Sequence, residues 1–297
     1  MLIHEQKNNN FVSKQDDFGK NNKNNDIQTF VTDSDEEIVF EGMTSLSGIL
    51  HGIASGCSDR RILRVFFDRE RVKKKEKEYR YLTAQAQTYG FSLQMTDREY
   101  LDAITTGTTH GGIVAVCSKR TFPSLEDAWR SSSLPFSKSD GFHVLLEGIE
   151  DPYNFGYTLR SLYAAGVDGV ILSPRNWMAV AGTVAKSSAG ASEQLPIAIA
   201  DPVEAIGLYR KQGYRIVCAG IRDSVSMYQA DLKVPLLLIV GGEKRGISSS
   251  VLSICDMIVR IDYGRAFKGS LSAASAATVL AFEILHQNSI KNSEDVR

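Results

Sequence analysis

The chain has 297 residues, is 43% hydrophobic and carries a formal net charge of −1 at pH 7. This length and apolar content suffice for two domains with buried cores, and the near-zero charge excludes a chain that is basic throughout. No apolar run approaches the ~20 residues that span a bilayer, and the N-terminus lacks the apolar segment of a signal peptide. We therefore expect a cytoplasmic protein without a membrane partner.

The four cysteines and five histidines are scattered along the chain. They include no CxxC pair and no cysteine with a neighbouring histidine, which are the spacings typical of zinc sites and redox pairs. We expect isolated thiols and no metal site.

Charge is distributed unevenly in the N-terminal part. Residues 1–37 contain four lysines against eight acidic residues and an asparagine-rich run without apolar periodicity, which predicts a disordered tail. Residues 59–80 contain ten Lys or Arg against five Asp or Glu. Such a run is either the solvated face of a helix or a surface for RNA phosphates. In the second case we expect the contacts to come from Arg60, Arg61, Lys73, Lys74 and Lys75.

Residues 38–118 predict a small α/β domain. The expected strands cover residues 38–40, 62–67, 91–95 and 113–117, and the expected helices cover 44–54, 72–89 and 98–104. Residues 119–140 are rich in Ser, Lys and Pro, which is typical of a linker between domains.

Residues 141–290 predict a second domain. Expected strands cover 142–146, 169–172, 197–199, 215–219, 236–240 and 257–261, with a tight loop at 151–156 and helices at 157–165, 177–188, 202–211 and after 270. This alternation indicates an α/β fold with a mainly parallel sheet. The absence of GxxxxGK[ST] and GxGxxG disfavours a P-loop protein or a nicotinamide-dependent enzyme.

Two stretches of small residues indicate a ligand pocket in this domain. The loop at 241–246, GGEKRG, directly follows a buried strand, and glycine lets the backbone turn sharply close to a ligand. Residues 270–277, SLSAASAA, enter a helix that can pack closely on other backbone. Because such turns follow strands, the pocket is expected at the carboxyl ends of the sheet, with Asn154 and Arg160 nearby.

These stretches resemble the motifs of a known family. Residues 151–156, DPYNFG, together with Arg160 resemble the first motif of the SpoU/TrmH-type RNA methyltransferases of the SPOUT superfamily. Residues 241–247, GGEKRGI, are similar to the second motif, and 270–272 with the following alanines to the third, with KSSAGA at 186–191 between them. The resemblance covers residues 142–288. It extends more loosely over 38–117, where 41–42 and 110–115 resemble the family's ribosomal-protein-like RNA-binding domain.

The resemblance implies a fold and an activity. The fold is an RNA-binding α/β domain at 38–118 followed by a SPOUT domain with a deep trefoil knot at 141–290, assembled as a homodimer. The activity is methyl transfer from S-adenosylmethionine to a ribose 2'-hydroxyl, with ribosomal RNA favoured over transfer RNA. By family position, the catalytic residues are Asn154, Arg160, Glu243, Ser270 and Ser272, and the cofactor-binding residues are Ala219, Gly220, Gly241, Gly242, Gly246, Ile261 and Leu271.

The residue types suggest roles within that site. Because arginine stays protonated in proteins, we interpret Arg160 as a clamp on an RNA phosphate that also steadies the developing oxyanion. Glu243 is expected to order Asn154 and its own loop. Ser272 stands where the family usually has Asn, and 262–263 read Asp-Tyr where Pro-Met is usual. One alternative function is therefore a noncatalytic RNA-binding protein that keeps the knotted fold. The other, which the choice between ribosomal and transfer RNA leaves open, is a transfer RNA 2'-O-methyltransferase.

Overall fold

The computed structural model describes residues 37–131, 134–174 and 180–289. Residues 1–36 of the expected tail and the first residues of the helix expected at 177–188 lie outside this part of the chain.

The N-terminal domain is built on a four-stranded mixed sheet with the order β1-β4-β2-β3. Its strands are β1 (Glu37–Glu41), β2 (Ile62–Asp68), β3 (Ser92–Thr96) and β4 (Ile113–Ser118). Strand β4 runs antiparallel to both neighbours, whereas β2 and β3 are parallel. Helices α1 (Gly42–Ala54) and α2 (Glu76–Tyr89) contribute to one core cluster, and α3 (Arg98–Ile104) contributes to a second. A short 3-10 helix, η1 (Arg69–Arg71), follows β2.

The second domain contains a seven-stranded sheet with the order β7-β6-β5-β10-β8-β11-β9, and all its strand pairs are parallel. The strands are β5 (Phe142–Glu147), β6 (Gly169–Leu172), β7 (Ile197–Ile199), β8 (Arg215–Ala219), β9 (Val225–Ser226), β10 (Leu236–Gly241) and β11 (Met257–Arg260). The central strand β10 is buried along almost its whole length, which explains its unbroken apolar sequence. The expectation of a mainly parallel α/β domain is confirmed.

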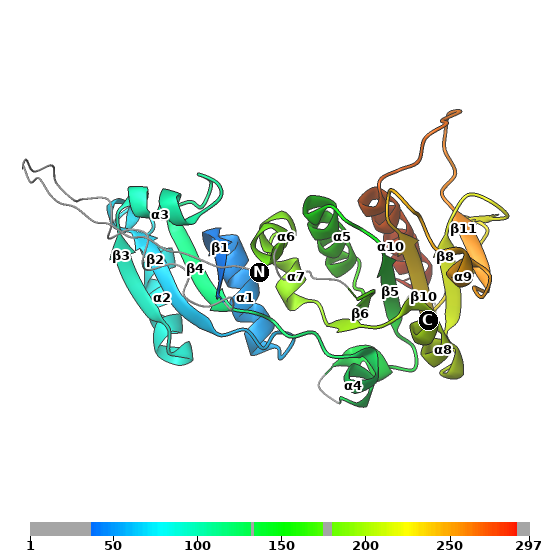
Figure 1. Cartoon of the computed structure of the whole chain (residues 1–297), viewed down its shortest axis with the longest axis horizontal. Coiled ribbons are helices and arrows are strands. Elements are labelled where there is room, and N and C mark those ends of the chain that lie inside the picture. Colours follow the sequence, from blue (N-terminus) through cyan, green and yellow to red (C-terminus); the bar gives the residue numbers. More distant parts are fainter. Residues whose placement is uncertain (1–36, 132–133, 175–179, 290–297) are drawn as a thin grey trace, which may run out of the picture. The chain divides into compact units, whose positions relative to one another are not determined.

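Helices cover both faces of this sheet (Figure 1). One face packs against α5 (Pro152–Ala164) and α10 (Ala273–Ser289), with α6 (Ala181–Ser187) beside α5. The opposite face packs against α4 (Leu125–Arg130), α8 (Pro202–Lys211) and α9 (Ser249–Leu252). The short helix α7 (Ala191–Gln194) contacts α1 of the N-terminal domain.

Residues 119–140 form more than a linker. They contain α4 and the 3-10 helix η2 (Pro135–Ser137), and Leu125, Ala128 and Phe136 are buried against the second sheet. These apolar residues are spaced singly among Ser, Lys and Pro, so composition alone concealed their packing.

Helix α5 begins earlier than expected. Residues 152–156 form its first turn rather than a loop, because Pro152 suits the first helical position and the Asp151 carboxylate accepts a hydrogen bond from the backbone N–H of Asn154 at 2.8 Å. Asn154 therefore lies inside the helix, with its side chain free for other contacts.

Candidate active site

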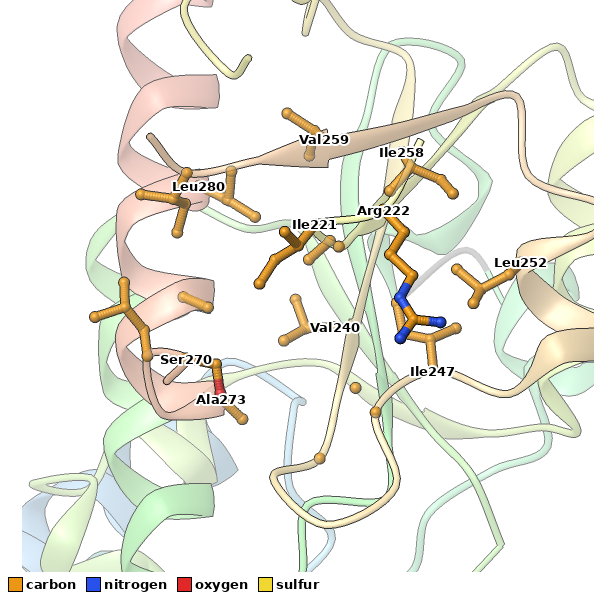
Figure 2. Close-up of a pocket in the computed structure, with 18 of the residues that line it drawn as sticks. Ile221, Arg222, Val240, Ile247, Leu252, Ile258, Val259, Ser270, Ala273 and Leu280 are labelled. Carbon is orange, nitrogen blue, oxygen red and sulfur yellow. The ribbon is translucent and has the colours of Figure 1, made fainter. Parts of the chain in front are cut away.

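A cavity of about 680 Å³ lies at the carboxyl ends of β8, β10 and β11, within the size range of small-molecule sites (Figure 2). All seven residues that the sequence assigned to the cofactor line it: Ala219, Gly220, Gly241, Gly242, Gly246, Ile261 and Leu271. Glu243 and Ser270 of the expected catalytic group line it as well. The structure thus brings together residues from four separate segments of the chain.

The glycines of the 241–246 loop are required by contacts between backbones. A Cβ atom on Gly242 would lie 1.9 Å from the carbonyl oxygen of Gly148, and one on Gly241 would lie 2.3 Å from the carbonyl carbon of Gly246. The loop is closed by the Gly246 N–H, which donates to the Gly242 carbonyl oxygen at 2.9 Å. The sequence suggested that these glycines leave space for a ligand. The structure shows that Gly242 also leaves space for the chain segment after β5.

Glu243 links three segments at the edge of the cavity. Its Oε1 atom accepts a hydrogen bond from Asn154 Nδ2 at 3.0 Å and another from the backbone N–H of Ala273 at 3.2 Å. The first donor lies in the first turn of α5, and the second begins α10. A charged acceptor strengthens both bonds, so the carboxylate fixes the Asn154 amide beside the cavity.

Arg160 lies outside the cavity wall. It lies on the exposed side of α5, and within the described residues it makes no hydrogen bond or ion pair. At 100° per residue, Arg160 shares its helix face with Tyr153 and Tyr157, whereas Asn154 lies about 120° away. The structure therefore does not bring Arg160 to the cavity of its own chain.

The two serines of the third motif have different surroundings. Ser270 lines the cavity, as Figure 2 shows. Ser272 immediately precedes α10, and its Oγ accepts a hydrogen bond from the backbone N–H of Ser275 at 3.2 Å. This is the geometry of a helix N-cap, for which Ser is well suited. The hydroxyl of Ser272 is thus committed to starting the helix.

Sequence reasoning missed four polar residues of the cavity wall: Arg222, Asp223, Ser253 and Tyr263. The guanidinium of Arg222 lies beside Ile247 and Leu252, across the cavity from Ser270 (Figure 2). Arg222 and Asp223 follow Ala219 and Gly220 after a single intervening residue, so the signal was their position after a strand already assigned to the cavity. Asp223 adopts φ of 50°, a conformation that is uncommon outside glycine and more frequent at functional sites.

Cys218, at the end of β8 next to the cavity wall, is an unsuitable nucleophile. Burial, with a smaller contribution from the neighbouring Cys255, raises the pKa of its thiol well above the usual range. The thiolate, which is the reactive form, is therefore scarce at neutral pH.

The basic residues expected to bind RNA differ in exposure. Arg61, Lys73 and Lys74 are exposed and Lys75 is half-buried. Arg60 is only 3% exposed: its Nε lies 2.7 Å from Glu193 Oε2 on α7, and its Nη1 donates to the carbonyl oxygen of Ser118 at 2.7 Å. The expectation that Arg60 contacts RNA phosphates is therefore wrong, because its charge is already paired in the interior.

The described part of the chain contains neither a metal site nor a membrane-spanning helix. Between residues 37 and 289, outside the gaps at 132–133 and 175–179, no group of three or more His, Cys, Asp or Glu side chains could hold a metal ion. No helix in the same residues is long and apolar enough to cross a membrane.

Comparison with known proteins identifies both domains. Residues 141–282 match the SpoU rRNA Methylase family, and residues 53–123 match the family described as RNA 2'-O ribose methyltransferase substrate binding. The cavity and the parallel sheet lie within the first match, and strands β2, β3 and β4 of the mixed sheet, with the basic residues, lie within the second. Together they define an RNA ribose 2'-O-methyltransferase that uses S-adenosylmethionine and carries its own substrate-binding domain.

Individual relatives show the particular family. The 23S rRNA (guanosine-2'-O-)-methyltransferase RlmB of Shewanella oneidensis is 31% identical over 210 residues, which cover 69% of this chain and 82% of the relative. The putative TrmH family tRNA/rRNA methyltransferase YacO of Bacillus subtilis is 27% identical over 228 residues, 76% of this chain and 89% of that protein. The chain belongs to the SpoU rRNA methylase family.

Solved structures agree on the fold. The SpoU methyltransferase AviRb from Streptomyces viridochromogenes, in complex with AdoMet, superimposes with a TM-score of 0.68 at 22% identity, over 86% of this chain and 92% of AviRb. The AdoMet-bound rRNA methyltransferase from Sinorhizobium meliloti gives a TM-score of 0.68 at 20% identity, over 84% of this chain and 87% of that one.

Proposed function

We propose that this protein methylates a ribose 2'-hydroxyl of ribosomal RNA in the cytoplasm. The observation that carries the proposal is the pair of hydrogen bonds at Glu243 Oε1, which fixes the Asn154 amide beside a cavity of suitable size for S-adenosylmethionine. Ribosomal RNA is favoured over transfer RNA because the first relative named above acts on 23S rRNA and because the substrate-binding match lies in a separate N-terminal domain.

The cavity suits the chemical groups of the cofactor. Apolar side chains on its walls, including Ile247, Leu252 and Ile258, offer surfaces for an adenine ring. Asp223 and Glu243 supply negative charge for an ammonium and a sulfonium group, and Arg222 supplies positive charge for a carboxylate. When bound, S-adenosylmethionine supplies a methyl carbon that is open to in-line displacement.

Asn154 positions the attacking hydroxyl in this proposal. Its Nδ2 atom is committed to Glu243, so its Oδ1 atom is left to accept a hydrogen bond from the ribose 2'-hydroxyl. Holding that oxygen in line behind the methyl carbon supplies much of the rate of such a displacement. Arg160 then binds the neighbouring phosphate through two parallel N–H groups and steadies negative charge that develops on the oxygen.

The RNA also contacts the N-terminal domain. Arg61, Lys73 and Lys74 remain candidates for phosphate contacts because their side chains are exposed. Lys75 is half-buried, with its Nζ near Gly111, and remains a candidate through the part of its side chain that is exposed. Each contact of this kind releases counterions, so RNA affinity falls as salt rises.

The protein functions as a homodimer in this proposal, through the outer face of α5 and α10. These helices pack against each other, and they expose Tyr153, Tyr157, Phe282 and Leu285 at 56%, 49%, 44% and 38% of their surfaces. Exposed aromatic and aliphatic side chains on adjacent helices are typical of a surface that a second copy covers. The face includes Arg160, so the interface lies next to the reacting groups.

A methyl-transfer assay tests the function. The purified protein, tritiated S-adenosylmethionine and transcribed 23S ribosomal RNA are expected to give label in the 2'-O-methyl ribose of one nucleotide. Transfer RNA in the same assay tests the competing substrate. Binding of S-adenosylhomocysteine and RNA without any label in either RNA would instead indicate a noncatalytic RNA-binding protein.

A further inference from the structure

The connection between β11 and α10 carries an unusual set of side chains. Residues 262–269, here called the arm, read DYGRAFKG and extend away from the end of β11 (Figure 1, orange). They combine two aromatic residues, Tyr263 and Phe267, with two cationic residues, Arg265 and Lys268. None of these four residues belongs to the group that sequence motifs assigned to the cofactor or to catalysis.

The first two residues of the arm are held by hydrogen bonds. The carboxylate of Asp262 accepts from the hydroxyl of Ser226 and, at 2.9 Å, from Arg260 Nε, and these contacts lower the pKa of Asp262, the Ser226 bond most. Tyr263 lines the cavity, and its hydroxyl oxygen accepts a hydrogen bond from the backbone N–H of Leu271 at 3.2 Å. The start of the arm is therefore fixed against a cofactor-binding residue.

The tip of the arm presents an aromatic ring to solvent. Phe267 is 58% exposed, and its ring centroid lies 5.7 Å from that of Tyr263 at an interplanar angle of 57°. Its inner side packs over Gly269, where a Cβ atom would lie 2.6 Å from the ring. Arg265 and Lys268 are exposed, and within the described residues neither makes a hydrogen bond or an ion pair.

We propose that the arm is a binding site for an unpaired RNA nucleotide, with the base stacked on Phe267 and the adjoining phosphates contacted by Arg265 and Lys268. The chemistry is specific to single strands, since an aromatic ring can stack only on a base that has left the helix. The inference deepens the proposed function. Because Tyr263 joins the arm to the cavity, the stacked nucleotide lies beside the ribose that is methylated.

A second copy of the chain is the competing occupant of this surface. The cations argue against it, because lysine is depleted at the cores of protein interfaces, and here Lys268 lies directly beside the exposed ring. A single-stranded nucleotide needs a flat apolar surface for its base and positive charge close by for its phosphates. The tip of the arm provides both.

Substitutions at Phe267 test the stacking. The probe is a fluorescein-labelled single-stranded RNA of twelve nucleotides, compared with the same strand annealed to its complement. Phe267→Ala is expected to weaken single-strand binding between about fivefold and about hundredfold, with a smaller effect on the duplex. Phe267→Trp is expected to bind as the native chain does, with its added fluorescence quenched by RNA. Phe267→Leu is expected to behave as Phe267→Ala, because leucine keeps the apolar bulk without a π-face.

Charge substitutions test the phosphate contacts. Arg265→Ala and Lys268→Ala are each expected to reduce the slope of log affinity against log salt by roughly 0.7 on the single strand. The controls are Lys211→Ala and Val203→Ala on α8, which packs on the face of the sheet opposite to α5 and α10. Both are expected to leave RNA binding unchanged.

Three outcomes overturn the inference. One is native RNA affinity for Phe267→Leu, another is unchanged salt slopes for both cation variants, and the third is loss of dimer by light scattering in Phe267→Ala. Calorimetry with S-adenosylhomocysteine distinguishes failure of the proposed function from failure of the inference about the arm. If the native chain fails to bind this cofactor product, the proposed function fails, whereas a Phe267-dependent difference between single strand and duplex still supports the arm.

Discussion

At the scale of single residues, Glu243 shows how one oxygen atom can hold a site together. Its Oε1 accepts from a side chain 89 positions earlier and from a backbone N–H 30 positions later. The sequence could place Glu243 in a glycine-rich loop and Asn154 after another strand. The two local patterns do not record the distance between these segments, so the expectation that Glu243 orders Asn154 came from the family resemblance alone.

The first prediction concerns Arg160. Arg160→Ala is expected to lower methyl transfer about 100- to 1000-fold, as for the removal of other groups that stabilise developing charge, with affinity for S-adenosylhomocysteine unchanged. Arg160→Lys is expected to fail as badly, because an ammonium group cannot reproduce the planar two-pronged contact. Tritiated-methyl transfer and calorimetry report the two steps separately. Parallel loss of cofactor binding in a folded variant would place Arg160 in the cofactor site instead.

The second prediction concerns His143 on β5. Its ring is fully buried, stacked on Phe136 and close to Tyr209 and Tyr214, and burial lowers its pKa from 6.5 to about 4 despite an opposing effect from Asp168. Between these two values the unfolded chain binds a proton that the folded chain does not. The free energy of unfolding therefore falls as the pH drops from about 6.5 to about 4, by about 3 kcal/mol in total.

Urea unfolding across this pH range measures the effect. His143→Phe is expected to remove most of the pH dependence, because an apolar ring of similar size has no proton to gain. The control is His286→Gln, at the exposed end of α10, which is expected to retain it. An equally steep loss of stability in His143→Phe would assign the dependence to other groups.

At the scale of elements, alternation and periodicity predicted the described strands except the two-residue β9, and they were insufficient for the start of α5. The apolar run of β10 predicts a buried parallel strand because both of its faces are covered by helices. The first turn of α5 was missed because Pro152 and Gly156 read as loop residues, although Asp151 caps a helix there. Ser272 was assigned to catalysis by its family position, and its local sequence did not show that its Oγ accepts a hydrogen bond at the start of α10.

The third prediction concerns the ion pair between Arg60, two residues before β2, and Glu193 on α7. Arg60 and Glu193 have side chains that are 2% and 4% exposed, so Arg60→Ala would leave a buried carboxylate without its partner. The free energy of unfolding is expected to fall by about 3–5 kcal/mol, measured by urea denaturation. The matched variant is Arg61→Ala at the exposed neighbouring position, which is expected to keep stability and weaken RNA binding. Equal stability of the two variants would contradict the structural role of Arg60.

At the scale of the whole molecule, the two domains share more than a linker. Ala181 and Ala185 of α6 are buried in the core of the N-terminal domain, and a Cβ atom on Gly48 of α1 would lie 2.5 Å from Gly190. Sequence composition predicted two separate folding patterns, yet it could not show this packing. The small residues that permit this packing do not indicate in the sequence which segment they contact. The trefoil knot stays a prediction.

The fourth prediction concerns the dimer. The alanines at the start of α10 do not form the proposed interface, because Ala273, Ala274 and Ala277 are buried within the chain, whereas the exposed large apolar side chains of this helix are Phe282 and Leu285. Phe282→Glu combined with Tyr157→Glu is expected to give a monomer by light scattering at micromolar concentration, because charge would be buried without a partner. Tyr228→Glu, at a position 68% exposed and outside these helices, is the control. An unchanged dimer would place the interface elsewhere.

The last prediction asks whose cavity Arg160 serves. Arg160 lies on the exposed face of α5 with Tyr153 and Tyr157 and does not line the cavity of its own chain, so in a symmetric dimer we expect it to act at the partner's cavity. Chains carrying Arg160→Ala and chains carrying Glu243→Ala are each expected to be inactive alone. Unfolded together and refolded as a mixture, they should form mixed dimers with one complete site, which restores about a quarter of the native methyl transfer. If Arg160 acts within its own chain, every site in the mixture lacks one group, and activity stays absent.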